Sequence, residues 1–280
     1  MSGTRNLLPR SVVLDHGVRP FLVAAVVLVA LLGIARRAIG TGPCSPTLAR
    51  CPATGCAAPG TPDALTDTLK RRTTLDNGTA ITLANAIPIT FADMMALQRR
   101  ADATGVRQHV HLRADERAQL HDLLPATRTR PAIGEGTAVR LAGFMIRNTT
   151  PHNGVHNSGA ESVNCRLTGP ANTDIHIPIV ETAGGEERTG VVVEMIPQSR
   201  SPNWTQRSLR ATAVAGTLVM FVGRLFFDSP HLVNGGTRAI ERQPRRSSLW
   251  EIHPVVGYYE CTAPNNTCTT ASLTDWHQVN

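Results

Sequence analysis

The chain has 280 residues, of which 41% are hydrophobic, so it is long enough for one or two domains with an apolar core. Its formal net charge is +7, but residues 137–261 hold 12 arginines against 10 acidic residues. A region this close to neutral lacks the broad basic surface of a polyanion-binding domain, so a nucleic-acid partner is not favoured.

The first element along the chain is an uncharged apolar segment, PFLVAAVVLVALLGIA at residues 20–35, with arginines on both sides. No face of it is polar, so it predicts a membrane helix and not a helix of a soluble domain. We expect residues 20–37 to form an uncleaved transmembrane anchor that follows a cytoplasmic segment at 1–19. Two arginines make ARRAIG a poor cleavage site. A cleaved signal segment, which would give a secreted protein, is the alternative.

Cysteine usage indicates where the rest of the chain is located. The cysteines are Cys44, Cys51, Cys56, Cys165, Cys261 and Cys268. An even number of cysteines beyond a membrane segment is typical of export to an oxidising compartment. Cys261 and Cys268 flank the turn sequence TAPNNT and are the predicted disulfide, whereas the pairing of the other cysteines stays open. Residues 38–63, rich in Cys, Pro and Gly, predict a stalk.

Residues 64–136 predict a helical extension that packs against the region after it. In TFADMMALQRRADATG, Thr90 is placed to cap a helix and Gly105 to end it. The stretch RADERAQLHDLLP predicts a second helix, which ends at Pro125.

From residue 137 the hydrophobic pattern takes a period of two, which is typical of β-strands. Five strands are predicted, at residues 137–146, 174–181, 189–196, 218–228 and 247–261. Before the fourth strand, PNWTQRSLRATAVAG predicts a helix with Asn203 as its cap, Gln206 in a capping box and Gly216 as its stop. The order β-β-β-α-β-β is that of an OB-fold. The fold class is therefore mainly β: an OB-like barrel at 137–261, with a C-terminal tail at 262–280.

Polar residues on these strands form a candidate site. The candidate metal ligands are His176, Asp228, His231, Glu251 and His253, with Glu194 as a candidate catalytic base. Carboxylates and imidazoles suit zinc or manganese, and a bound metal ion can activate water. Their spacing, however, matches no local metal-binding signature. Strand alternation alone also places polar side chains opposite apolar ones, and the sequence favours this structural interpretation, with a polar face or network on the barrel.

The basic loop RAIERQPRR precedes the last strand, where OB-folds have one of their ligand-binding loops. Arg242, Arg245 and Arg246 are therefore candidate ligand-binding residues. Stacking aromatics are absent nearby in the sequence, which favours a solvated loop.

Six short motifs occur in a fixed order: LKRR (69–72), ESVNC (161–165), DIHI (174–177), VVVEMIP (191–197), LFFDSPH (225–231) and WEIHP (250–254). In these motifs the chain resembles a group of uncharacterised bacterial secreted or envelope proteins with an OB-like domain. The resemblance covers about residues 62–261, and Val163 departs from the Cys-Asn-Cys form of the group. It implies the same domain and no particular substrate.

The sequence thus predicts a membrane-anchored binding or accessory protein of the cell envelope, with its main domain outside the cytoplasm and an unknown ligand. The membrane, through residues 20–37, and envelope proteins are the expected partners. A metal-dependent hydrolase of phosphodiesterase type, using the His and carboxylate residues, is the alternative. Single-stranded nucleic-acid binding is a second alternative, which predicts affinity that falls steeply with salt.

Overall fold

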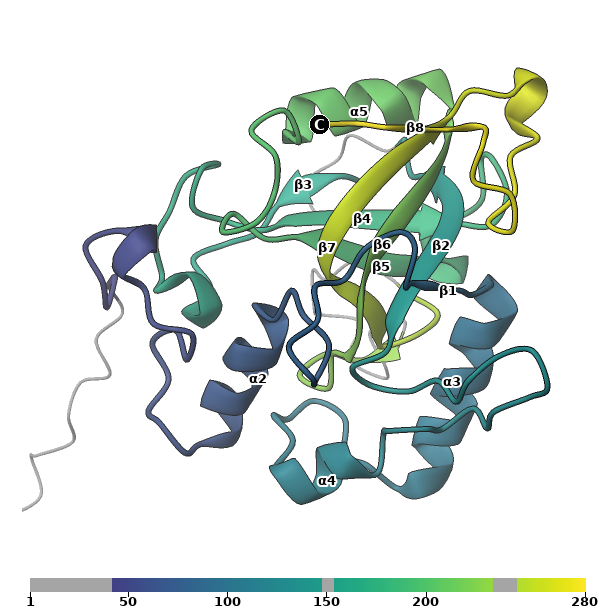
Figure 1. Cartoon of the computed structure of the whole chain (residues 1–280). Helices are drawn as coiled ribbons and strands as arrows, with labels where there is room; N and C mark the ends of the chain where they lie inside the picture. Colours follow the sequence, from purple (N-terminus) through teal and green to yellow (C-terminus); the bar gives the residue numbers. More distant parts are fainter. Residues whose placement is uncertain (1–41, 148–153, 234–245) are drawn as a thin grey trace, which may run out of the picture. The chain divides into compact units, whose positions relative to one another are not determined.

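A closed β-barrel lies at the centre of the computed structural model, which describes residues 42–147, 154–233 and 246–280 (Figure 1). The barrel strands are β2 (Ala138–Met145), β4 (Ile175–Val180), β5 (Val191–Met195), β6 (Leu218–Phe227) and β7 (Trp250–Cys261). Neighbouring strands run β2-β6-β7-β5-β4, and an additional pairing of β2 with β4 closes the barrel. Every barrel strand lies within a predicted range, because the period of two continues through each strand.

The connectivity agrees with the element order expected for an OB-like barrel. β5 and β7 are parallel, and the other barrel pairs are antiparallel. Three short strands extend this sheet: β1 (Ile87–Pro88) beside β2, β3 (His156–Asn157) beside β4, and β8 (Trp276–Gln278) beside β7.

Alternation along the strands separates the barrel interior from its outer face. Interior residues are fully buried in one apolar cluster that includes Val139, Leu141, Ile177, Val193, Phe221, Leu225 and Ile252. The residues that alternate with them lie outside this interior. Ala138, Met220 and Val222, for example, pack in a second apolar cluster outside the barrel. Side chains that precede or follow an interior residue of β4, β5 or β7 therefore lie on the outer face.

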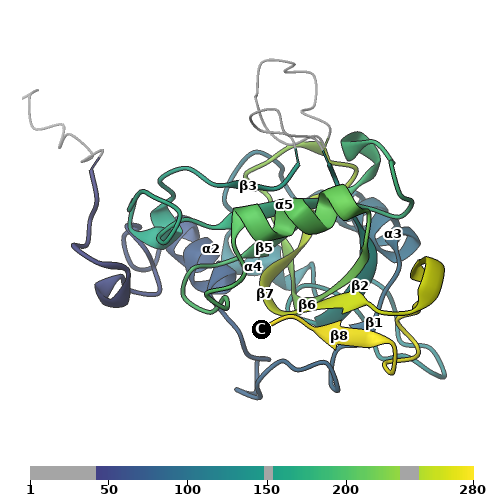
Figure 2. The ribbon, with the colours of Figure 1, turned by 90° about the horizontal axis from the view of Figure 1, so that it is seen from above.

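Helix α5 (Gln206–Ala215) lies across one end of the barrel (Figure 2). Its apolar residue Leu209 is fully buried in the barrel core. The helix ends at Gly216, as predicted, where a φ of +68° favours glycine. Its predicted cap is wrong: the hydroxyl of Thr205, and not Asn203, accepts a hydrogen bond from the Ser208 backbone nitrogen at 3.0 Å.

Within residues 42–137, the α-helices that precede the barrel are α2 (Pro62–Lys70), α3 (Phe91–Thr104) and α4 (Ala114–Ala118). Thr90 caps α3, and Gly105 ends it, as predicted. The predicted continuation of α4 to Pro125 is wrong, because Leu124 instead pairs with Ile133 in an isolated antiparallel bridge. Short 3-10 helices occur at η1 (Leu48–Arg50), η2 (Ser162–Asn164), η3 (Glu187–Thr189) and η5 (Pro264–Asn266).

Three disulfides fix the described chain: Cys44–Cys56, Cys51–Cys165 and Cys261–Cys268. The last is the pair that the sequence predicts. The segment expected to be a stalk is held against the loop at 161–165, because Cys51 is bonded to Cys165 and the Cys56 backbone nitrogen donates to the Ser162 carbonyl at 3.1 Å. These residues therefore form part of the folded unit and are not a free spacer.

The predicted anchor at residues 20–37 lies outside the described residues. Within the described ranges, none of the helices combines the length and apolar character that crossing a membrane requires.

Candidate functional site

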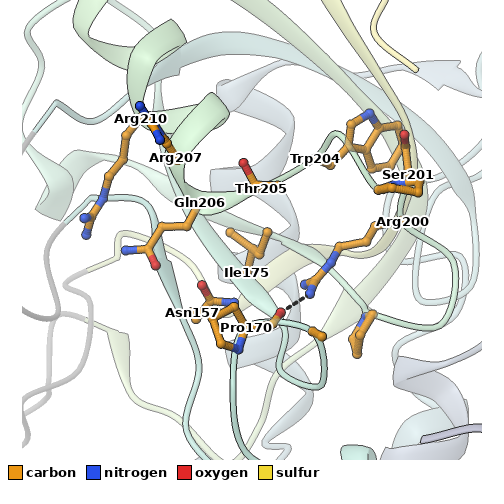
Figure 3. A pocket seen from close by; sticks show the side chains of 13 residues that line it. Asn157, Pro170, Ile175, Arg200, Ser201, Trp204, Thr205, Gln206, Arg207 and Arg210 are labelled. Carbon is orange, nitrogen blue, oxygen red and sulfur yellow. Dashed lines mark hydrogen bonds between the residues drawn. The ribbon is translucent and has the colours of Figure 1, made fainter.

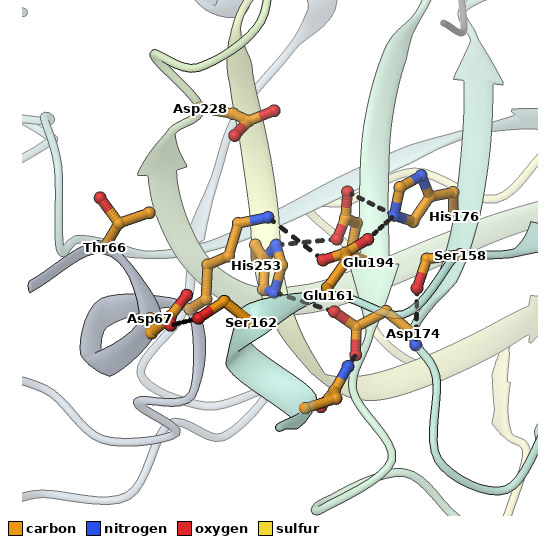
Figure 4. Close-up of polar contacts among 12 residues, drawn as sticks. Thr66, Asp67, Ser158, Glu161, Ser162, Asp174, His176, Glu194, Asp228 and His253 are labelled. Carbon is orange, nitrogen blue, oxygen red and sulfur yellow. Dashed lines mark hydrogen bonds and ion pairs between the residues drawn. The ribbon is translucent and has the colours of Figure 1, made fainter. Parts of the chain in front are cut away.

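The outer face of β4, β5 and β7 carries a cluster of ionisable side chains: Asp174, His176, Glu194, Glu251 and His253. Figure 4 shows Asp174, His176, Glu194 and His253. The antiparallel register of β4 and β5 places His176 opposite Glu194. The parallel register of β5 and β7 places Val193 opposite Ile252, which brings Glu194 beside His253. Asp174, Glu251 and His253 are 0% exposed and Glu194 is 1% exposed, so this polar face is a buried one.

Helix α2 and the segment around η2 cover the cluster. Lys70, at the end of α2, places its Nζ atom 3.8 Å from Oε2 of Glu161. The other Glu161 oxygen, Oε1, lies 3.4 Å from Nε2 of His176. The Cys51–Cys165 disulfide joins the segment before α2 to the loop that contains η2. The two covering segments are therefore linked covalently beside the cluster.

Within the cluster, Glu194 contacts both histidines. Its Oε2 atom lies 3.1 Å from Nδ1 of His253, and its Oε1 atom lies 3.2 Å from Nε2 of His176. Glu251 Oε2 approaches the same His253 Nδ1 at 3.5 Å, while His253 Nε2 lies 4.0 Å from Oδ2 of Asp174. His253 therefore lies among three carboxylates.

Asp174 is oriented by two amide side chains. Asn164 Nδ2 donates to Asp174 Oδ1 at 2.8 Å, and Gln198 Nε2 donates to Asn164 Oδ1 at 2.8 Å. The other oxygen, Asp174 Oδ2, accepts no hydrogen bond from the described residues. This chain of amides fixes the direction in which Oδ2 points.

Asp228 and His231 lie in a neighbouring group around Arg246. Arg246 Nη1 lies 3.2 Å from Asp228 Oδ2 and also contacts Glu251 Oε1. His231 Nδ1 pairs with Asp228 Oδ2. Arg246, which the sequence predicts as a ligand-binding loop residue, has a side chain that is 1% exposed and pairs with these two buried carboxylates. Arg242 and Arg245 lie outside the described residues.

The carboxylates determine the protonation of the two histidines. Burial alone would lower the pKa of each imidazole. Glu194 and Glu161 together outweigh burial at His176 and raise its pKa to about 9, and Glu194 and Glu251 together raise the pKa of His253 to about 10. Burial opposes the ionised form of Glu194, yet the two histidines hold its pKa well below the usual range. Burial, with the charge of Glu161, raises the pKa of Asp174 to about 6.

The predicted metal ligands do not converge on one point. Asp228 and His231 pair with each other at the Arg246 end. Of the described residues, Asp174, Glu194 and His253 do converge, with one possible ligand atom from each within 4.8 Å of the others. Cys44, Cys56 and Cys165 also converge, but their sulfurs are in disulfides and are not available as ligands.

Some residues of the cluster were not selected from the sequence. Asp174 shares a strand face with His176, and this alternation could have added it to the candidate ligands. Lys70, Glu161 and Asn164 come from covering segments, and within the sequence only the LKRR and ESVNC motifs point to them.

A pocket of about 780 Å³ lies between α5 and the loops next to β3 and β4 (Figure 3). Its apolar lining includes Ile175, Trp204 and the prolines Pro170, Pro197 and Pro202, and its basic lining consists of Arg200, Arg207 and Arg210. This pocket is not among the sites predicted from the sequence. The sequence WTQRSLR, which places an aromatic residue and two arginines at the start of one helix, is the signal that points to it.

The arginines of the pocket differ in how they are held. Arg200 Nη1 donates to the Thr173 carbonyl at 2.7 Å, and Arg210 Nε donates to the Val155 carbonyl at 2.8 Å. Arg207 is exposed and lies one helical turn from Arg210. Trp204 Nε1 donates to the Val279 carbonyl at 2.8 Å, which fixes the indole at the pocket wall. The pocket therefore combines an apolar wall with positively charged groups.

No protein-family model matches the chain, and neither a curated protein nor a solved structure is detectably similar to it.

Proposed function

We propose that the protein is an OB-like binding protein of the cell envelope, and that the pocket beside α5 takes a ligand with an apolar body and an anionic group. The observation that carries this proposal is the pocket itself, about 780 Å³ with Trp204, Ile175 and three arginines in its lining. Small-molecule sites are concave, mostly apolar and of about 300–1,000 Å³, with a few polar groups that orient the ligand.

The basic lining favours an anionic ligand. Guanidinium groups bind carboxylates, sulfonates and phosphates through two parallel hydrogen bonds. Arg200 and Arg210 are held by backbone carbonyls, which fixes their charge beside the pocket. An anionic group on a ligand would accept charge-assisted hydrogen bonds from guanidinium groups held in this way.

Two observations of different kinds support the proposed location. Three disulfides among the described residues favour an oxidising compartment outside the cytoplasm. The apolar segment at residues 20–37 provides the proposed membrane anchor. A secreted protein with the same pocket is the alternative.

The geometry favours binding over the hydrolase and nucleic-acid alternatives. A hydrolytic metal centre must be reached by its substrate, whereas Asp174, Glu251 and His253 are 0% exposed beneath the covering segments. Single-stranded nucleic acids are held by a series of stacking aromatics, whereas Trp204 is the one aromatic residue in the lining of this pocket.

The test uses full-length protein in lipid nanodiscs and isothermal titration with naphthalene-2-sulfonate, with empty nanodiscs as the blank. We expect saturable binding, and weaker binding of the neutral analogue naphthalene-2-methanol. Arg207→Gln should weaken sulfonate binding about tenfold, or ~1.4 kcal/mol. Arg99→Gln, which removes an exposed arginine on α3, should leave it unchanged. Equal affinities for the sulfonate and the alcohol, or equal effects of the two substitutions, would contradict the proposal.

A further inference from the structure

We infer that Asp174, Glu194 and His253 form a buried binding site for a divalent metal ion of the zinc or manganese class. This site is separate from the pocket beside α5, and it differs from the ligand set predicted from the sequence. One possible ligand atom from each residue lies within 4.8 Å of the other two. At metal–ligand distances of about 2.0–2.2 Å, tetrahedral donors lie roughly 3.3 Å apart, so small side-chain rotations are enough to bring the donors together.

The atoms that face the site lack hydrogen bonds. Asp174 Oδ2 and His253 Nε2 are buried, and neither has a hydrogen-bond partner among the described residues. Buried polar atoms are normally paired, because leaving one unpaired costs about 1–3 kcal/mol. These two atoms lie 4.0 Å apart, which is beyond hydrogen-bonding range, whereas Glu194 Oε2 lies 3.1 Å from Nδ1, the other nitrogen of the ring. A metal ion beside His253 Nε2 would be a partner for both Asp174 Oδ2 and His253 Nε2.

The surrounding residues orient the ligands as in known metal sites, where metal-binding groups are held by further hydrogen bonds. Asn164 occupies Oδ1 of Asp174 and leaves Oδ2 directed at His253. His176 lies beside Oε1 of Glu194 and leaves Oε2 directed at the same ring. Asp174 therefore has one oxygen held and the other facing His253 Nε2, whereas the carboxylate of Glu194 would turn away from Nδ1 to reach the proposed ion.

The local charge permits a dication. Two ligands are carboxylates, and the imidazole binds a metal as a neutral ring after it loses its proton. The cation Lys70 lies 3.8 Å from Glu161, and the cation Arg246 is paired with Asp228 and Glu251. Carboxylates outside the proposed ligand set thus pair with these two cations, whereas the imidazole of His176 lies 3.2 Å from the ligand Glu194.

The test measures metal in tag-free, full-length protein in nanodiscs, by mass spectrometry of the elements. Separate samples are incubated with Zn²⁺ or Mn²⁺ and then passed through a desalting column. We expect about one ion per chain for at least one metal. Asp174→Asn should reduce the bound metal at least fivefold, whereas Asp115→Asn, an exposed carboxylate on α4, should retain it. Unfolding temperatures of both variants show whether the fold is kept.

A readout on the unsubstituted protein covers the case in which Asp174→Asn does not fold. Removing the ion with a chelator should lower the unfolding temperature by several degrees, and adding it back should restore that temperature, because an ion that binds only the folded state stabilises it. Failure of both metals to bind stoichiometrically overturns the inference. Metal that is retained by folded Asp174→Asn, or that leaves the unfolding temperature unchanged, overturns it too.

Discussion

The carboxylate of Glu194 lies 3.1 Å from Nδ1 of His253, and both side chains are buried on the outer face of the barrel beneath the covering segments. A buried charge pair of this kind adds little when compared with apolar packing, but removing one partner leaves the other charge uncompensated. Each of the two residues therefore compensates the charge of the other, whether or not a metal ion binds at the site.

The first prediction concerns this pair. Glu194→Gln should lower the free energy of unfolding by about 3–5 kcal/mol, because His253 and His176 would lose their shared counter-charge. Urea denaturation followed by circular dichroism measures the change. Glu186→Gln, in an exposed ion pair with Arg188, should change stability by less than ~1 kcal/mol. If Glu194→Gln also lowered the free energy of unfolding by less than ~1 kcal/mol, the two histidines would not depend on Glu194 as their counter-charge.

The alternation of the barrel strands made much of this fold predictable. Apolar side chains such as Ile177, Val193 and Ile252 recur at every second position, and the five strand ranges follow from them. Strand alternation also assigns Glu194 and His253 to one face. Helix α3 was predictable too, because its capping residues Thr90 and Gly105 interact with residues only a few positions away.

The burial of the cluster could not be predicted, because it depends on contacts between distant segments. Whether His176 faces water or Glu161 is decided by the docking of the loop that follows residue 157, and Lys70 arrives from α2. That docking is tied to the Cys51–Cys165 bond, and spacing alone did not select this pairing. The pocket beside α5 likewise needs the loop at 197–204 to be placed against Ile175.

The second prediction is a pH dependence from Asp67. Burial raises the pKa of this carboxyl from 3.8 to about 6, although the Ser162 hydroxyl, which donates to it at 2.6 Å, partly opposes the shift. The folded state therefore binds the proton more tightly than the unfolded state, so this group's contribution to stability falls as pH rises from about 4 to about 6.

Asp67→Asn imitates the protonated carboxyl and should remove this dependence. Relative to the unsubstituted protein, the variant should gain on the order of 1 kcal/mol in unfolding free energy between about pH 4 and about pH 7. Denaturant titrations of both proteins across this range measure the difference. A difference that stays constant with pH, or that changes in the opposite direction, would show that Asp67 titrates normally.

The third prediction compares two disulfides that close loops of different length. Cys51 and Cys165 are 114 residues apart, whereas Cys261 and Cys268 are 7 apart. In the chain-entropy description, replacing both cysteines by serine should cost about 5 kcal/mol for the first pair and about 2 kcal/mol for the second.

The first replacement also frees the segment that covers the charged cluster. We expect limited proteolysis to cut the Cys51→Ser, Cys165→Ser protein within residues 42–72 at concentrations of protease that leave the Cys261→Ser, Cys268→Ser protein intact. Equal stability losses and equal cleavage would indicate that the cover is held by packing and not by its covalent link.

The fourth prediction concerns Gly223, where strand β6 passes closely over the end of the WEIHP motif. A Cβ atom at this position would lie 2.3 Å from the Pro254 carbonyl oxygen and 2.6 Å from Cγ2 of Ile252. Both neighbours belong to β7, and the register of the two strands shifts on each side of Gly223. Gly223→Ala should therefore push β7 away and displace His253, the residue between these two contacts.

We expect Gly223→Ala to lower the unfolding free energy by about 1–3 kcal/mol, as overpacking of a core does. It should also weaken any metal bound by His253, which links the strand contact to the proposed site. Gly159→Ala is the matched control, because nothing lies within 4 Å of a Cβ at Gly159. If both glycine variants unfold at the same denaturant concentration, β7 can move without cost, and the position of His253 is then not fixed by the barrel.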